Sequence, residues 1–233
     1  MKGNYVSSFD RFEVLLVGDE ESGKTTLLKK IKSTEPRPAP TGKHATVVQP
    51  RTCSPEDMRE SYLRISLAKE RVQVKFYETR FPDSIECFSD ILPKFSGMVY
   101  VLNLEKFDEI DNISGVPFLD LELKRFSELF KMTSSRRIHS LLVWTKEDVF
   151  EEKIRNNCKL PRRGAFSNFN GQMYNNPAKV REYILERFEE VVKPLDLLSY
   201  YLRVPVSSNE ITAARVFECM NTQIFMKQII ATH

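Results

Sequence analysis

The feature that most constrains this chain is an eight-residue segment, Gly-Asp-Glu-Glu-Ser-Gly-Lys-Thr, that begins at Gly18. It matches the pattern G-x-x-x-x-G-K-[ST], in which glycines allow backbone N–H groups to close around a polyphosphate. A nearly continuous apolar run over residues 11–17 precedes it, which is typical of a strand buried on both faces. Apolar residues at helical spacing follow it, namely Leu27, Leu28 and Ile31. This order of strand, loop and helix predicts a phosphate loop (residues 18–25) within an α/β domain.

The pattern gives roles to the polar residues of the phosphate loop. Lys24 is expected to reach the outer phosphates from a surface loop, and Thr25 to offer its hydroxyl to Mg²⁺. The residues expected to contact the nucleotide in this segment are Glu20, Glu21, Ser22, Gly23, Lys24, Thr25 and Thr26. The alternative is a chance Gly-Lys-Thr sequence that does no more than begin a helix.

The rest of the chain alternates predicted strands with predicted helices. Strands are expected near residues 63–67, 72–76, 98–104, 141–144 and 201–206. Helices are expected near residues 119–130, from Asn176 and Pro177 onward, and around residues 217–224. The first two of these strands read as a hairpin, so we predict an α/β fold with a six-stranded, mostly parallel sheet and helices on both faces. The stretch 158–177 is predicted to be a surface loop.

Composition limits the class of protein. A hydrophobic fraction of 41% is enough for a buried core, and 233 residues suit one α/β domain better than two small ones. The 35 basic and 32 acidic residues leave a net charge of +3, which lacks the bias of a dedicated nucleic-acid binder. Four widely spaced cysteines and three isolated histidines indicate neither a disulfide framework nor a metal cluster. Without an apolar run of about 20 residues or a signal peptide, we expect a cytoplasmic protein with no integral membrane segment, peripheral to a membrane only through a partner.

A second motif follows the strand expected at 141–144. Thr145-Lys146-Glu147-Asp148 has the form [NT]-K-x-D, with which Ras-like GTPases read guanine. The carboxylate of Asp148 could accept from both N1–H and the exocyclic amine of guanine, whereas adenine presents no such pair of donors. The stem of Lys146 would pack on the base. The alternatives are a helix N-cap at Thr145 among solvated charges, or an ATPase or kinase in which this tetrapeptide is accidental.

These segments resemble a heterotrimeric G-protein α subunit more than a small GTPase. Residues 21–26, Glu-Ser-Gly-Lys-Thr-Thr, look like that family's E-S-G-K-S/T-T loop, and residues 146–154 are close to its K-K-D-L-F-x-E-K-I segment. A later Val-Ser-Ser-Asn stretch parallels its C-A-T-D strand end, which implies that Ser207 and Ser208 contact the nucleotide. The resemblance spans about residues 11–230 and implies a Ras-like P-loop GTPase fold that binds GTP or GDP with Mg²⁺.

The domain plan departs from that family in three places. The chain has only a Pro-rich linker where the family inserts an all-helical domain. We therefore expect a single Ras-like GTP-binding domain over residues 11–233. A short N-terminal extension at residues 1–10 is expected to precede it. Ten residues before the first strand are too few for the family's helix that contacts βγ, and the last helix stops at His233, short of the receptor-contacting tail. These departures argue against coupling to βγ and to receptors in that family's manner, and the expected partner is a protein effector or regulator.

The family's arginine and its Mg²⁺-ligating threonine in switch I are matched only in part. Arg37 stands five residues before Gly42, which is the spacing of the arginine in the family's R-x-x-T-T-G. Its alternative role is that of a solvated linker arginine. The same register puts Pro40 at the position of the Mg²⁺-ligating threonine, so Thr41 or Thr46 would have to replace it.

The segment after the strand expected at 72–76 lacks the family's D-x-G-G-Q. It reads Tyr-Glu-Thr-Arg-Phe-Pro, in which Glu78 could hold Mg²⁺ through water but Phe81 and Pro82 cannot orient a hydrolytic water. Glu20 also stands near the γ-phosphate, where the family has glycine. These changes predict a regulatory GTP/GDP switch that is at most a slow GTPase. The alternative is a pseudo-GTPase interaction module that binds nucleotide weakly or without turnover.

Overall fold

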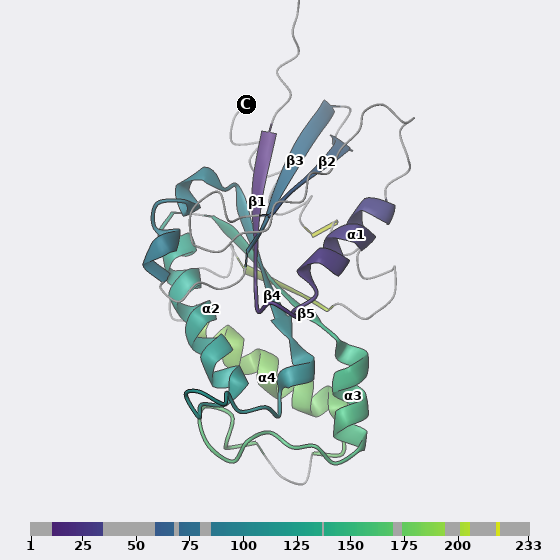
Figure 1. Cartoon of the computed structure of the whole chain (residues 1–233), viewed down its shortest axis with the longest axis vertical. Helices are drawn as coiled ribbons and strands as arrows, with labels where there is room; N and C mark the ends of the chain where they lie inside the picture. Colours follow the sequence, from purple (N-terminus) through teal and green to yellow (C-terminus); the bar gives the residue numbers. More distant parts are fainter. Residues whose placement is uncertain are drawn as a thin grey trace, which may run out of the picture.

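The structure is a computed structural model that describes residues 11–34, 59–67, 70–79, 85–136, 138–169, 174–193, 201–205 and 218–219. Its strands are β1 (Arg11–Val17), β2 (Arg59–Leu67), β3 (Glu70–Thr79), β4 (Gly97–Asn103), β5 (His139–Thr145) and β6 (Tyr201–Pro205). Its α-helices are α1 (Lys24–Thr34), α2 (Phe118–Ser135), α3 (Glu147–Arg155) and α4 (Pro177–Val192) (Figure 1). Short 3₁₀ turns lie between them, namely η2 (Ile85–Phe88), η3 (Leu92–Lys94) and η4 (Leu104–Lys106).

The strands of the described residues form one sheet in the order β2-β3-β1-β4-β5-β6. Strands β3, β1, β4 and β5 run parallel to one another, and the short β6 pairs parallel with β5 at one edge. At the other edge β2 runs antiparallel to β3, with Leu63 opposite Val74 and Ile65 opposite Val72, which confirms the predicted hairpin. The predicted α/β class with a parallel sheet is also confirmed, and the arrangement is compatible with a Rossmann-like or P-loop-like fold.

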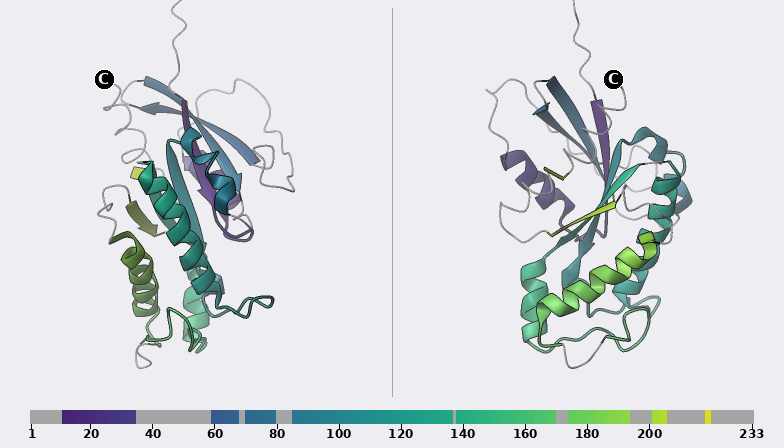
Figure 2. Two further views of the ribbon diagram at one scale, coloured as in Figure 1. Left: turned by 90° about the vertical axis from the view of Figure 1, so that its left-hand side faces the viewer. Right: turned by 180° about the vertical axis from the view of Figure 1, so that it is seen from behind.

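The central strands are buried on both faces because helices cover both sides. Leu15, Tyr100 and Leu142 belong to one apolar cluster with residues of α2, α3 and α4. The residues that alternate with them, such as Leu16 and Val101, are equally buried and point to the opposite face, as strand geometry requires. Helix α1 covers that second face, on the opposite side of the sheet from α2 and α4 (Figure 2). Its buried residues are the predicted Leu27, Leu28 and Ile31.

Helix α4 begins where the sequence predicts it. The side chain of Asn176 accepts a hydrogen bond from the backbone N–H of Lys179, and Pro177 occupies the first helical position, where its missing N–H has no intrahelical partner. The buried face of α4 includes Val180 and Ile184, which the helical spacing also indicates. Local signals therefore fix both the start and the orientation of this helix.

The predicted surface loop at 158–177 needs a correction. Its described residues before α4 contain neither helix nor strand, as expected, but Leu160 and Phe166 are almost completely buried in the main apolar cluster. The ring of Phe166 packs edge-on against Tyr183 of α4, with centroids 6.3 Å apart. The loop is therefore part of the core, because its apolar side chains cover one side of α4.

Two further expectations can be compared with the structure only within the described residues. Of the helix expected around residues 217–224, the structure describes only residues 218 and 219, which are helical. Within the described ranges, every helix is too short or too polar to span a bilayer.

Candidate functional site

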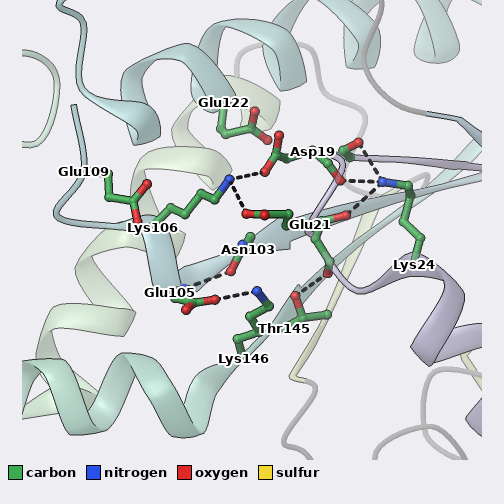
Figure 3. Close-up of polar contacts among 12 residues, drawn as sticks. Asp19, Glu21, Lys24, Asn103, Glu105, Lys106, Glu109, Glu122, Thr145 and Lys146 are labelled. Carbon is green, nitrogen blue, oxygen red and sulfur yellow. Dashed lines mark hydrogen bonds and ion pairs between the residues drawn. The ribbon is translucent and has the colours of Figure 1, made fainter. Parts of the chain in front are cut away.

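The candidate site lies at the carboxyl edge of the parallel strands. Because β3, β1, β4 and β5 are neighbours and run in one direction, the segments that follow them meet at one edge of the sheet. The phosphate loop follows β1, and the base motif (residues 145–148) begins at the last residue of β5. Figure 3 shows both segments on either side of the residues that end β4. The fold thus brings together two motifs that the sequence places far apart.

Glycines give the phosphate loop its shape. A Cβ atom at Gly18 would lie 2.3 Å from the carbonyl oxygen of Val101 on β4, so only glycine fits where the loop leaves β1. Gly23 has a φ of +84°, in the left-handed region that other residues rarely adopt. Between them, the backbone N–H of Ser22 donates to the carbonyl of Asp19 over 3.0 Å and closes a tight turn. The loop is therefore a preformed turn at the N-terminus of α1.

Lys24 is buried within this loop, whereas the sequence predicted a lysine exposed on a surface loop. Its ammonium donates to the carbonyl oxygens of Gly18 and Asp19 over 2.8 and 2.5 Å, and to the hydroxyl of Ser22 over 3.1 Å. The side chain is only 7% exposed. Burial lowers the pKa of Lys24 to about 8, although the carboxylates of Asp19 and Glu78 partly offset it. A phosphate anion at this position would favour the charged ammonium.

Thr25 and Glu78, both predicted as Mg²⁺ ligands, lie side by side. The Thr25 hydroxyl donates to Oε2 of Glu78 over 2.6 Å, from the first turn of α1 to the end of β3. Oxygen donors of this kind suit Mg²⁺, which usually takes one or two protein ligands and completes its shell with water and phosphate oxygens. In the part of the chain that the structure describes, no group of three or more His, Cys, Asp or Glu side chains is placed to hold a metal. Thr25 and Glu78 are the described residues that would hold Mg²⁺ if a nucleotide carried it into the site.

The base motif is tied to the phosphate loop. The Thr145 hydroxyl donates to the carbonyl of Ser22 over 2.6 Å. Helix α3 begins only at Glu147, and its N-cap is Lys146, with a left-handed φ of 57° and no side-chain cap. The alternative in which Thr145 caps this helix is therefore wrong. Asp148 lies in the first turn of α3 with an exposed side chain.

Lys146 is held in place by a residue that follows the neighbouring strand β4. Its ammonium forms an ion pair with Oε2 of Glu105, in the η4 turn that follows β4. The stem of Lys146 thus lies between α3 and η4, about a third exposed. No motif in the sequence pointed to a role for Glu105.

Lys106 is a second residue that the sequence analysis missed. Its ammonium lies 2.7 Å from Oδ2 of Asp19 and 3.0 Å from Oε2 of Glu21, so it crosses from η4 to the phosphate loop. Burial by itself lowers the pKa of Lys106, but its hydrogen bonds to these carboxylates outweigh burial and raise the pKa. Burial likewise raises the pKa of Asp19, and the hydrogen bond from Lys106 brings it below the ordinary value. The position directly after a predicted strand was the one signal that could have pointed to Lys106.

A buried carboxylate lies behind the phosphate loop. Glu122 of α2 is fully buried, accepts from the Tyr100 hydroxyl over 2.9 Å and pairs with Arg125 over 2.7 Å. Burial raises the pKa of Glu122, while its hydrogen bond with Arg125 acts against that rise. These contacts fasten α2 to β4 beside the site. An amphipathic helix pattern could not show that Glu122 faces inward.

Several expected site residues can be placed only in part. Glu20 and Thr26 are exposed on and just after the phosphate loop. The arginine and threonine expected in switch I and the two serines expected after β6 lie outside the described residues: Arg37, Thr41, Ser207 and Ser208. The geometry of the site therefore comes from the phosphate loop, the base motif, Glu78 and η4.

Comparison with known proteins adds no assignment. A scan against models of protein families gave no match, and a search of curated proteins gave no significant match. What this site does must therefore be argued from its own geometry.

Proposed function

We propose that this chain is a guanine-nucleotide-binding regulatory protein with a Ras-like P-loop fold, similar to a minimal G-protein α subunit. The observation that carries the proposal is the hydrogen bond from Thr145 to the carbonyl of Ser22, which joins the base motif directly to the phosphate loop. A nucleotide that contacts one of these segments is thereby within reach of the other. The ATPase and kinase alternatives leave this contact between the two motifs unexplained.

The site offers complementary groups for each part of the nucleotide. Backbone N–H groups at the N-terminus of α1 and the Lys24 ammonium would bind the phosphates. Thr25 and Glu78 would hold Mg²⁺, which neutralises phosphate charge when bound. The exposed Asp148 would accept from guanine, with the Lys146 stem against the base. Ser207 and Ser208 remain predicted base contacts.

We infer slow or impaired hydrolysis from the residues that follow β3. Thr79 ends that strand, and the sequence continues with arginine, phenylalanine and proline where a water-orienting glutamine would stand. Glu20 adds an exposed acidic side chain to the phosphate loop. The function proposed is thus a switch whose GTP and GDP states gate a protein effector or regulator. The same residues favour, as second candidate, a pseudo-GTPase module that binds nucleotide without turnover.

Calorimetry with the full chain tests the proposal. After removal of any co-purified nucleotide, GTP and GDP should bind with Mg²⁺, and ATP should bind at least about 10-fold more weakly. Lys24→Ala should abolish GTP binding. Lys29 is an exposed lysine on the same helix, so Lys29→Ala should leave GTP binding unchanged. A parent protein that binds neither GTP nor GDP would refute the proposal. Release of phosphate from bound GTP then separates the slow switch from the pseudo-GTPase.

A further inference from the structure

The phosphate loop carries an unfavourable run of charge. Asp19, Glu20 and Glu21 follow one another, and the side chains of Asp19 and Glu21 are 24% and 68% exposed. A nucleotide polyphosphate is itself an anion, so carboxylates in this loop repel it unless a cation lies close by. Lys24 is the single basic residue of the phosphate loop, against these three acidic residues. The loop therefore needs a second positive charge to bind phosphate well.

Lys106 supplies a positive charge at this point. It bridges Asp19 and Glu21 from the opposite side of the loop, at 2.7 and 3.0 Å (Figure 3). Its side chain is only 20% exposed, so the low local dielectric makes this contact stronger than one at an open surface.

The fold fixes the direction of the Lys106 side chain. Asn103, the last residue of β4, accepts the backbone N–H of Glu105 on its side-chain oxygen over 3.1 Å and so starts the η4 turn. Leu104, the first residue of the turn, and Phe107, which follows the turn, are fully buried. The Lys106 ammonium also lies 5.6 Å from the centre of the Phe118 ring. Lys106 is thus an anchored side chain and not a freely solvated one.

Asp19 links Lys106 to Lys24. Its carboxylate binds the Lys106 ammonium, while its backbone carbonyl accepts from Lys24 over 2.5 Å and from the N–H of Ser22 over 3.0 Å. The ion pair with Lys106 thus holds the same residue whose carbonyl accepts from Lys24. The two lysines act on one residue from opposite sides.

We propose that Lys106 is a positioning residue of the phosphate site, which neutralises Asp19 and Glu21 and, through Asp19, holds the carbonyl that orients Lys24. This inference rests on the proposed function, because it concerns the same phosphate site. It adds the requirement that polyphosphate binding depends on a lysine outside the G-x-x-x-x-G-K-[ST] pattern.

Binding measurements on the full chain test this role with two probes, GTP with Mg²⁺ and inorganic tripolyphosphate with Mg²⁺. Lys106→Met, which keeps an unbranched apolar side chain but removes the charge, should weaken both by roughly 10-fold. Lys106→Arg should bind within about threefold of the parent, because its guanidinium can pair with both carboxylates. If the methionine variant does not fold, Lys106→Gln takes its place, with the same direction of change expected.

Arg187→Met is the matched control. Arg187 pairs with Glu190 over 2.7 Å within α4, and its side chain is 29% exposed, against 20% for Lys106. Its guanidinium also lies 5.0 Å from the centre of the Tyr183 ring, much as the Lys106 ammonium lies near Phe118. Loss of this pair should leave tripolyphosphate affinity unchanged. If Arg187→Met weakens tripolyphosphate binding as strongly as Lys106→Met, the inference is wrong, because loss of any ion pair would then have the same effect.

Salt provides a readout that a merely structural role would not change. Between about 0.05 and 0.5 M salt, the affinity difference between parent and Lys106→Met should shrink, because charge neutralisation is screened. A difference that stays constant with salt, or equal affinity of the two proteins, overturns the inference and leaves the proposed function standing. If the parent binds neither probe, the proposed function and the inference both fail.

Discussion

The hydroxyl of Thr25 lies 2.6 Å from a carboxylate oxygen of Glu78, although 53 residues separate them along the chain. This contact joins the start of α1 to the end of β3 and places two oxygen donors beside the phosphate loop. It is the strongest structural support for a role of Glu78, which the sequence offered only as a substitute for an aspartate.

The first prediction concerns Mg²⁺. Glu78→Gln should weaken Mg²⁺-dependent GTP binding roughly 10-fold, because a neutral amide is a poorer ligand for a hard cation than a carboxylate. In EDTA the parent and the variant should bind GTP about equally, which provides the internal control. Titration of a fluorescent GTP analogue with and without Mg²⁺ measures both values. A variant equally weakened in EDTA would show that Glu78 acts on the fold of the loop and not on the metal.

The second prediction concerns pH. Burial sets the pKa of Lys24 at about 8 in the protein without nucleotide, and only the protonated ammonium attracts phosphate. Affinity for GTP should therefore be highest below pH 8 and decrease above it, by roughly 10-fold between pH 7 and pH 9 for one proton taken up on binding. Lys24→Arg keeps its charge at these pH values, so its affinity, whatever its size, should lack this decrease. A parallel loss in both proteins would assign the effect to another group.

The third prediction concerns the base. Asp148→Ala should weaken GTP binding by at least about 10-fold and leave ATP binding nearly unchanged, because only guanine presents the paired donors. Glu152→Ala, an exposed carboxylate one helical turn further along α3, is the matched control and should not change either affinity. Calorimetry with both nucleotides gives the comparison. If Asp148→Ala binds GTP like the parent, the base motif does not read guanine.

The fourth prediction concerns hydrolysis. Single-turnover GTP hydrolysis should be at least tenfold slower than the roughly 10⁻² s⁻¹ typical of α subunits with their own arginine. Glu20→Gly combined with Gly-Gly-Gln in place of Thr79, Arg80 and Phe81 should raise the rate, and Arg37→Ala should then lower it. Quenched-flow detection of released phosphate measures these rates. A parent rate equal to that of ordinary α subunits would mean that another residue orients the water. Glu78 would then be the first candidate to test by substitution.

The sequence determined the local elements of the site because their signals lie within a few residues. The apolar run at 11–17 is β1, the helix after the phosphate loop is α1, and Asn176 with Pro177 begins α4. The glycine pattern of the loop also follows from local backbone geometry, as Gly23 shows. Burial could not be inferred in the same way, so the structure corrected the exposure expected for Lys24 and for the loop at 158–177.

Only the tertiary structure decided which distant residues meet. The contacts of Thr25 with Glu78, Asp19 with Lys106 and Ser22 with Thr145 join residues 53, 87 and 123 positions apart. Periodicity predicts that strands exist but not their order in the sheet, and it is the order β3-β1-β4-β5 that aligns the carboxyl ends carrying these residues. The sequence by itself therefore determined a phosphate loop and a base motif. The order of the strands decided that Glu78 lies beside that loop and that Lys106 holds it.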